Sequence, residues 1–405
     1  MLLSRYVIVG NGAAGTACAE ELRKNDPSSP VILFTDEPYP LYNRVSLRHY
    51  LKGEIPERKV FVRDIPWHEK YGIDFRPETP VVALDAANHT VTTARGEKVV
   101  FDRLLIATGG TPTPLAVPGG DARGVMYLQT MHDARLLEGV LPAARRAVVV
   151  GGSYLAYNLA DIFRHWGLET TWLIRGPAFL RRDLDATAGA LADTLAAEAG
   201  VQVIHGEEVA SIQVDNGYVR AVTTTGGRTI EADLVGAGIG LTMNLGFARG
   251  QVEIRRGVVV DAFLRTSSPD IFAAGDVAEF PEPVTGALML AGTWDNAAAQ
   301  GRLAARNMMG GRETYQNIPE HNTDFFASQI TVMGITPDVR TDLESVAGLD
   351  DSGRNYRRLF FWQDRLVGAV LIGNRKGKLR LLQMIREKLP ITGPRQALLD
   401  PGALA

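Results

Sequence analysis

The chain has 405 residues, of which 45% are hydrophobic and 22% charged, and a formal net charge of -3. This is the composition of a soluble globular protein, and the length predicts two or three domains of about 100–200 residues each. No apolar run approaches the roughly 18 residues that cross a membrane. Cys18 is the only cysteine, which excludes a disulfide or a pair of redox thiols within one chain.

The stretch from Tyr6 to Gly15, YVIVGNGAAG, predicts a nucleotide-binding turn. Its apolar residues 7–9 are typical of a buried parallel strand, and a helix is expected over residues 13–24. The glycines between them spell G-x-G-x-x-G, a spacing that allows a tight turn, the approach of a pyrophosphate and close packing of helix on strand. Amides at the start of the helix can hold phosphates without a cationic side chain. Because MLLSR leads directly into this strand, without room for a signal peptide, we expect a cytoplasmic protein.

A second apolar strand, Val31 to Phe34, runs into Asp36 and Glu37, about 20 residues after the glycine turn. A carboxylate at this spacing binds the ribose of a dinucleotide. The motif therefore predicts a dinucleotide site, and the alternative is a tight turn with two surface acids. The irregular segment that follows, residues 37–53, is rich in Pro and Tyr, and long irregular segments in compact domains are usually functional.

Further strands are expected at residues 81–84, 99–101 and 103–110, followed by a Pro-rich linker, residues 111–120, that predicts a domain boundary. Beyond this linker the opening pattern repeats. A strand over residues 147–150 enters the G-x-S-x-x-A turn from Gly151 to Ala156, and a helix and a strand follow over residues 157–166 and 171–174. Residues 235–240 close the repeat, which predicts a second dinucleotide site.

The second repeat differs from the first at the position expected to bind the ribose. Ile174 replaces the carboxylate, and Arg175, Arg181 and Arg182 lie just beyond. Loss of the acid beside arginines is the pattern expected for the 2′-phosphate of NADPH, because guanidinium groups bind phosphate bidentately. The alternative is a degenerate site that binds no nucleotide.

The last third of the chain combines a third glycine-containing strand end with a basic tail. Residues 266–277 are expected to form a strand ending at Gly275 and Asp276, and residues 295–309 a helix. Strands over 325–332, 358–361 and 366–372 and a helix over 378–388 should follow. Residues 354–405 hold eleven Lys or Arg against three acids, which leaves the rest of the chain near -11.

We expect this basic tail to dock an acidic protein partner, and a solvated surface without a partner is the alternative. Nucleic acid is disfavoured, because no base-stacking aromatics interrupt the densest basic run, residues 375–380.

Together these motifs resemble the FAD-dependent pyridine nucleotide-disulfide oxidoreductases, and they lie in that family's order. The matching elements are the two glycine turns, the Ala107-Thr108-Gly109 turn and Ala274-Gly275-Asp276. The stretch PYPLYNRVSL is similar to rubredoxin and ferredoxin reductases and to the flavin module of NADH-dependent nitrite reductase. Where thiol-dependent members carry a redox cysteine, this chain has residues 42–45, YNRV.

The resemblance implies an α/β fold with two Rossmann-like domains, the second inserted in the first, and a small α+β C-terminal domain. Residues 1–112 and 243–318 would bind FAD, residues 113–242 would bind NAD(P)H, and residues 319–405 would form an interface domain. In relatives that last domain packs beside the flavin and can contribute to a homodimer.

The resemblance also implies cofactor-binding residues, but no metal and no catalytic acid, base or nucleophile. Arg44 would join the first glycine turn at the FAD pyrophosphate, Asp276 would bond the ribityl chain, and the helix start at Trp294 would face the flavin ring. The Ile-Arg…Arg pattern is similar to that of NADPH-dependent glutathione reductases. The expected binding residues are Gly10, Gly12, Ala13, Ala14, Gly15, Asp36, Glu37, Asn43, Arg44, Val81, Ala107, Thr108, Gly109, Gly151, Ser153, Tyr154, Leu155, Arg175, Arg181, Gly240, Gly275, Asp276 and Trp294.

The sequence departs from the family pattern in two places. Arg48 and His49 stand where relatives often carry Ser-Lys, and Asn158 replaces a glutamate near the nicotinamide. The expected function is transfer of electrons from NAD(P)H through FAD to a rubredoxin- or ferredoxin-type protein. The alternative, raised by Asn158, is a flavin-binding interaction protein whose nicotinamide site is slow or vestigial.

Overall fold

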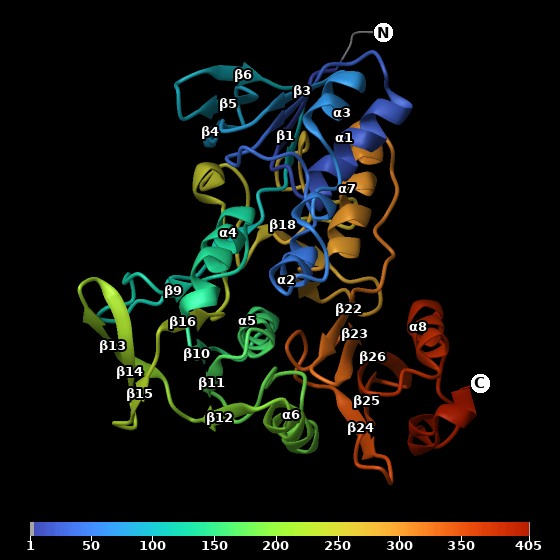
Figure 1. Ribbon diagram of the computed structural model, residues 1–405. Helices are drawn as coiled ribbons and strands as arrows, with labels where there is room; N and C mark the ends of the chain where they lie inside the picture. The colour runs from blue at the N-terminus through green and yellow to red at the C-terminus, as the bar shows by residue number, and fades with distance from the viewer. Residues whose placement is uncertain (1–3, 405) are drawn as a thin grey trace. The chain divides into compact units, whose positions relative to one another are not determined.

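The computed structural model describes residues 4–404, which form two compact units. The first unit contains residues 4–43, 57–111 and 243–319. The second contains residues 44–56, 112–242 and 320–404. The chain thus passes repeatedly between the units, as the colour sequence in Figure 1 shows. Residues 44–56, which the sequence analysis places in the FAD domain, group with the second unit.

The first unit is built on a parallel five-stranded sheet in the order β19-β7-β1-β2-β3. Its central strand β1 is apolar and buried along its whole length, as expected for a parallel sheet covered on both faces. Figure 1 shows helices α1 and α7 running side by side in this unit. The elements are β1 (Tyr6–Val9), α1 (Ala13–Asn25), β2 (Val31–Phe34), α3 (Ile65–Lys70), β3 (Ile73–Arg76), β7 (Arg103–Ile106), β19 (Ile271–Ala273) and α7 (Trp294–Met308).

Two small sheets complete the first unit. An antiparallel sheet contains β4 (Val81–Asp85), β5 (Thr90–Thr93) and β6 (Lys98–Val100). Only its two outer strands, β4 and β6, are predicted from the sequence. The other sheet contains β18 (Val258–Val259), β20 (Ala278–Pro281) and β21 (Leu288–Met289).

The second unit contains another parallel sheet, in the order β12-β11-β10-β16-β9, and a three-stranded antiparallel meander that packs on it. Helices α2, α4, α5 and α6 belong to the same unit. The elements are α2 (Leu47–Leu51), β9 (Val125–Met126), α4 (Met131–Val140), β10 (Arg146–Val150), α5 (Tyr154–His165), β11 (Glu169–Ile174), α6 (Ala186–Glu198), β12 (Val201–His205), β13 (Val209–Asp215), β14 (Tyr218–Thr224), β15 (Thr229–Glu231) and β16 (Leu234–Ala237). A further pair consists of β8 (Gly110–Pro112) and β17 (Leu241–Met243).

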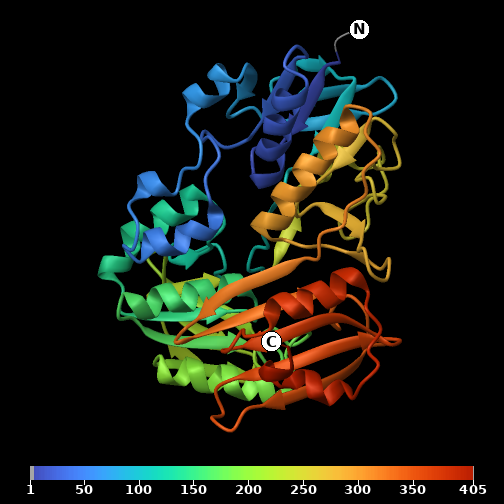
Figure 2. The same cartoon turned by 90° about the vertical axis from the view of Figure 1, so that its right-hand side faces the viewer.

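The C-terminal part of the second unit is an antiparallel sheet in the order β22-β23-β26-β25-β24, with α8 packed on β26 (Figure 2). The expected single strand over residues 325–332 is wrong, because the chain reverses at Phe326, where φ is +51°. The elements are β22 (Glu320–Phe325), β23 (Ser328–Gly334), β24 (Glu344–Leu349), β25 (Tyr356–Trp362), β26 (Arg365–Ile372) and α8 (Lys378–Glu387). Within residues 4–404, no helix has both the length and the apolar character needed to cross a membrane.

Candidate dinucleotide sites

The first glycine turn joins β1 to α1 and depends on close backbone contacts. Gly10 has a φ of +113°, and a Cβ on it would lie 2.1 Å from the carbonyl oxygen of Ala107. A Cβ on Gly15 would lie 1.8 Å from the carbonyl oxygen of Gly10. Gly12 has the opposite environment, with no heavy atom within 4 Å of a Cβ built there. The turn therefore leaves open space at the glycine that a pyrophosphate would approach.

The start of α1 is suited to bind an anion. Its N-cap is Gly12, which has no side chain to accept a hydrogen bond from the first amides, and the first turn, which begins with Ala13 and Ala14, holds no acid. These amides and the positive end of the helix dipole favour phosphate. The Asn11 side chain fixes the turn by donating to the carbonyl oxygen of Tyr39 at 3.2 Å and accepting from Thr16 Oγ1 at 2.9 Å.

The two candidate ribose acids follow β2, next to the glycine turn. β2 pairs with β1 in parallel, so their carboxyl ends meet at one edge of the sheet. Asp36 is exposed there, whereas Glu37 accepts a hydrogen bond of 2.5 Å from the Tyr42 hydroxyl. Of the two candidate acids, Asp36 thus has an accessible carboxylate, whereas Glu37 is engaged in a contact with the following loop.

Residues expected near the flavin lie at the same edge of the sheet. Thr108 follows β7, and its hydroxyl donates to the carbonyl oxygen of Asn244 at 2.8 Å. Gly275 follows β19, the neighbour of β7, and donates to Gln300 Oε1 at 2.8 Å. Gln300 lies on α7, is 0% exposed, and its Nε2 has no hydrogen-bond partner in the described chain. A buried amide with an unmet donor fits a site that holds a polar ligand.

Four further predicted residues lie near this edge or beside it. Ala107 and Gly109 flank Thr108, and Asp276 follows Gly275. Trp294 begins α7 behind the N-cap Thr293, whose hydroxyl accepts from the Asn296 amide at 3.3 Å. Asn43 and Val81 lie apart from these turns: the Asn43 amide donates to Val60, and Val81 begins β4.

The second glycine turn reproduces the geometry of the first with different residues. Gly151 also has a φ of +113°, and a Cβ on it would lie 2.3 Å from the carbonyl oxygen of Gly238. In the first turn the closely packed glycine is Gly15. In the second turn it is Gly238, because a Cβ on Gly238 would lie 2.3 Å from the backbone nitrogen of Ala156. Ser153 caps α5, donating to Gly238 at 2.6 Å and accepting from Ala156 at 3.3 Å. The serine hydroxyl is therefore already engaged within the turn.

Arg175 and Arg181 extend from the loop that follows β11. Ile174 is 2% exposed, whereas the Arg175 side chain is 68% exposed and its nearest carboxylate, on Glu208, is 3.9 Å away. Arg181 lies over Gly176, since a Cβ on that glycine would be 2.7 Å from Arg181 Cδ. The structure thus brings these two predicted arginines to one end of β11. Arg182 differs, because it forms an ion pair with Asp338.

Tyr154 is predicted to touch the cofactor, yet its ring packs inside the protein. The ring lies 3.6 Å from that of His321, centroid to centroid, and meets Phe179 edge-on at 6.0 Å. Its hydroxyl is buried and has no hydrogen-bond partner in the described chain. Burial lowers the pKa of His321 to about 4, so this imidazole is neutral at physiological pH. Leu155 and Gly240 lie at the same edge of the parallel sheet, after β10 and β16.

Arg48, noted above as a departure from the family pattern, is the centre of a buried ionic cluster. It is 7% exposed and lies 3.1 Å from Asp324 and 3.8 Å from Asp161. Its guanidinium also donates to the Tyr157 hydroxyl at 3.1 Å. Sequence reasoning missed this cluster, because its members lie on three segments far apart in the chain. Arg44, predicted to hold pyrophosphate, donates to the carbonyl oxygen of Gln129 at 2.6 Å.

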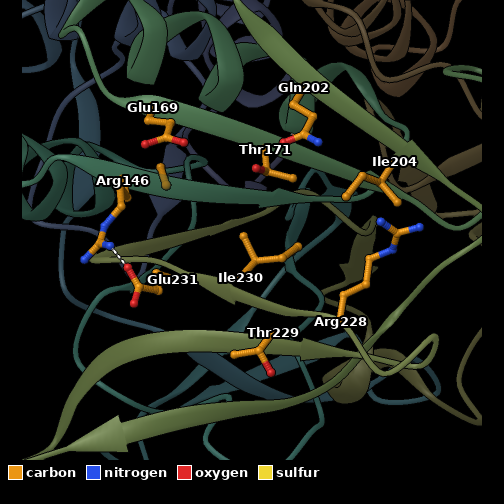
Figure 3. Close-up of a pocket in the computed structure, with 10 residues that line it drawn as sticks. Arg146, Glu169, Thr171, Gln202, Ile204, Arg228, Thr229, Ile230 and Glu231 are labelled. Atoms are coloured by element: carbon orange, nitrogen blue, oxygen red, sulfur yellow. Dashed lines mark hydrogen bonds and ion pairs between the residues drawn. The ribbon is translucent and has the colours of Figure 1, made fainter.

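A cavity of about 530 Å³ lies elsewhere in the second unit, between the parallel sheet and the meander (Figure 3). Arg146 and Glu169 begin β10 and β11, so the cavity is at the amino ends of these strands. Dinucleotides bind at the carboxyl ends of such sheets. The cavity is therefore not the nucleotide site, and its Arg146 pairs with Glu231 across the opening.

Comparison with known proteins identifies the family. Residues 4–301 match the pyridine nucleotide-disulphide oxidoreductase model, and residues 324–389 match the rubredoxin NAD+ reductase C-terminal domain. The chain therefore belongs to the pyridine nucleotide-disulphide oxidoreductase family. The predicted family and the fold class of two Rossmann-like domains are confirmed. FAD and a nicotinamide dinucleotide are the cofactors that fit this family.

Among its relatives, rhodocoxin reductase from Rhodococcus erythropolis is 29% identical, over 96% of this chain and 91% of that protein. The ferredoxin–NAD(+) reductase component of the biphenyl dioxygenase system from Paraburkholderia xenovorans is 31% identical, over 82% and 81%. A crystal structure of the covalent putidaredoxin reductase–putidaredoxin complex matches with a TM-score of 0.91 at 26% identity, covering 98% of this chain and 96% of that one.

The assimilatory nitrate reductase electron transfer subunit from Bacillus subtilis is 28% identical over 99% of this chain. The chain spans about half the length of that protein, 52%, and a similar share, 48%, of the nitrite reductase [NAD(P)H] of the same organism.

Proposed function

We propose that this chain is an FAD-dependent NAD(P)H oxidoreductase that passes electrons to a small acidic redox protein of the rubredoxin or ferredoxin type. The observation that carries the proposal is the pair of strand–glycine turn–helix units, the first with an accessible acid and the second with exposed arginines. The relatives named as ferredoxin and rhodocoxin reductases support it. FAD, when bound, accepts a hydride from NAD(P)H and releases electrons singly.

The protein's own residues would bind and orient the cofactor. The backbone amides of the first turn of α1, after the N-cap Gly12, would hold the pyrophosphate, and the Asp36 carboxylate would accept hydrogen bonds from the ribose hydroxyls. The positive end of α7, at Trp294, would favour negative charge on the flavin ring. We propose the predicted division into FAD, NAD(P)H and C-terminal domains, and a cytoplasmic location, on the same basis. Fluorescence of a tagged chain in its native host tests the location.

Anaerobic mixing of the yellow holoprotein with NADPH or NADH tests the activity. We expect the flavin absorbance to bleach within seconds and to recover when an oxidised ferredoxin or rubredoxin is added. If the flavin stays oxidised, the chain is a flavin-binding interaction protein instead, as Asn158 in place of a glutamate would allow. A protein that cannot be loaded with FAD would contradict both functions.

A preference for NADPH is the finer part of the proposal, and it rests on Arg175 and Arg181. Replacing both by Ala should raise the KM for NADPH about tenfold or more, since charge-assisted bonds contribute about 1.5–3 kcal/mol. The KM for NADH should stay within twofold. Arg220→Ala, at an exposed ion pair with Asp215 in the meander, is the control. Several relatives are named for NAD(+), so equal effects on both nucleotides would overturn the preference.

The basic tail supplies a docking surface. Some of its cations are engaged within the protein: Arg354 pairs with Glu198, Lys378 with Glu320 and Arg395 with Glu344. The exposed remainder at the start of α8 includes a leucine that is 78% exposed. We call this surface the basic α8 patch, and it comprises Arg375, Lys376, Leu379 and Arg380. An exposed apolar side chain that neighbours several exposed cations suits an acidic protein partner.

A further inference from the structure

The loop that carries the predicted phosphate-binding arginines packs both on the parallel sheet, through Phe179 and Trp172, and on the C-terminal sheet, through Phe179 and Phe325. This arginine loop, residues 175–185, joins β11 to α6. Its backbone contacts the second glycine turn through the Leu180 amide, which donates to the carbonyl oxygen of Gly152 at 3.1 Å. Leu180 itself has a φ of +45°, in the left-handed region that disfavours branched side chains. Such a conformation persists where the surroundings impose it.

The C-terminal sheet contributes to those surroundings through two partly buried hydrogen bonds. Thr336 Oγ1, just after β23, donates to Asp183 Oδ1 at 2.5 Å. The Tyr356 hydroxyl, at the start of β25, donates to Asp185 Oδ2 at 2.6 Å. Asp185 also caps α6 by accepting from the Ala188 amide at 3.0 Å. The two bonds therefore fix the end of the loop that follows Arg181.

A ring contact and an ion pair hold the rest of the loop. Phe179, 1% exposed, stacks on Phe325 of β22 with the ring centroids 5.0 Å apart and the planes at 27°. Arg182 pairs with Asp338, in the connection after β23. Arg181 thus lies between residues that the C-terminal sheet holds on both sides, while its own guanidinium remains exposed.

We propose that the C-terminal sheet sets the preference for NADPH, because it positions Arg181, beside Arg175 at the end of β11, to bind the 2′-phosphate. The inference rests on the proposed NADPH preference and adds the residues that maintain it. Bidentate binding of phosphate needs guanidinium groups in a fixed geometry, which long side chains on a loose loop lose. Thr336 and Tyr356 are therefore positioning residues that never touch the nucleotide.

Steady-state kinetics of the holoprotein with each nucleotide test the inference. Thr336→Val and Tyr356→Phe should each raise the KM for NADPH by about fivefold, the loss of roughly one hydrogen bond. The kcat with NADPH and both constants with NADH should stay within twofold. Thr336→Ser, which keeps the hydroxyl, should restore the wild-type ratio of the two KM values. If Thr336→Val does not fold, the same test can be made with Tyr356→Phe and with Asp338→Asn, which removes the exposed ion pair to Arg182.

A matched control comes from an ion pair that joins the same two parts of the unit outside the loop. Arg354, before β25, pairs with Glu198 at the end of α6, with 2.6 Å between Nη1 and Oε2. Arg354→Gln should leave the ratio of the KM values for NADPH and NADH unchanged. If this variant changes the ratio as much as Tyr356→Phe does, the effect is a general loosening of the domain, and the inference is overturned.

The double variant of Arg175 and Arg181 separates the failure of this inference from the failure of the proposed function. If the double variant keeps the NADPH preference, then phosphate recognition by these arginines is wrong and the inference falls with it. If the double variant loses the preference while Thr336→Val and Tyr356→Phe keep it, only the inference is wrong. If the proposed NADPH preference and this inference are both correct, adding Tyr356→Phe to the double variant should cause no further change in the KM for NADPH.

Discussion

At the scale of single residues, Asp183 shows how strongly the arginine loop is embedded. Burial raises the pKa of its carboxyl from 3.8 to about 6, although the hydrogen bond from Thr336 opposes the shift. The folded protein therefore binds this proton more tightly than the unfolded chain does. Stability from this group is complete below about pH 4 and is lost as the pH rises through about 6. A shift of two units corresponds to roughly 3 kcal/mol.

Asp183→Asn removes this titration while keeping an oxygen for Thr336 to donate to. Relative to the wild type, the variant should gain unfolding free energy as the pH rises from about 4 to about 6, and the difference should then level off. Urea unfolding of both holoproteins across this range measures it. Asp215→Asn, at the exposed ion pair with Arg220 in the meander, is the control. A wild-type-to-variant difference that is independent of pH would show that the Asp183 pKa is not raised.

At the scale of elements, the Arg48 cluster connects the residue 44–56 segment to α5 and β22. Arg48→Met should lower the unfolding free energy by about 2 kcal/mol, less than the roughly 3–5 kcal/mol of a fully buried pair. The reduction is smaller because Asp161 keeps Lys52 at 3.1 Å and the Asp324 side chain is 53% exposed. Urea unfolding measures the loss, and Arg220→Met at an exposed pair should cost under about 1 kcal/mol. Equal losses in the two variants would mean that burial adds nothing to the Arg48 contacts.

The elements that sequence reasoning predicted are those whose signals are local. Both glycine turns and their flanking strands were predicted, because the turn residues and the apolar runs adjoin in the sequence. The hairpin at Phe326 was not, since its turn contains neither glycine nor proline. Helix α6 was also missed, because its alanine-rich sequence buries residues without a clear periodic pattern. Strand β5, TVTT, is only four residues long and was not predicted.

Site residues divide in the same way. Arg175 and Arg181 could be predicted as a pair because both lie in the short loop after a predicted strand. The roles of Arg182 and Asp183 could not, because their partners Asp338 and Thr336 lie more than 150 positions away. Contacts over such separations follow from the packing of domains, which no local pattern encodes.

At the scale of the whole molecule, cofactor binding and stability should be linked. Asp276 follows Gly275 at the edge of the sheet where the predicted FAD-binding residues lie, so Asp276→Ala should weaken FAD retention. Because a ligand that binds only the folded state stabilises it by mass action, and does so less when it binds more weakly, the Tm of the variant should rise less than that of the wild type at each concentration of added FAD. Thermal unfolding at several FAD concentrations measures this. Asp270→Ala, at the half-buried ion pair with Arg103, is the control, and identical responses in the two variants would contradict a role for Asp276.

The electrostatic field of the whole chain should determine how a redox partner approaches it. The basic α8 patch stands out against a remainder that is near -11, so an acidic redox protein should be steered to it. The rate of acceptor reduction should then fall steeply as salt rises, because the screening length shortens to roughly 10 Å at about 0.1 M. Neutralising Arg375, Lys376 and Arg380 to Gln should lower that rate at low salt and remove most of its salt dependence, while reduction of the flavin by NADPH stays unchanged.

Lys24, Arg95 and Lys98 form a matched control, since they are exposed cations of the first unit and their replacement by Gln removes the same net charge. If this control slows acceptor reduction as much as the α8 variant does, net charge rather than the patch steers the partner. If neither variant changes the salt dependence, the partner docks elsewhere. Leu379→Ser tests the contribution of the apolar contact separately. Because this contact forms after the encounter, the variant should change the dissociation rate of the partner and leave the salt dependence of its association unchanged.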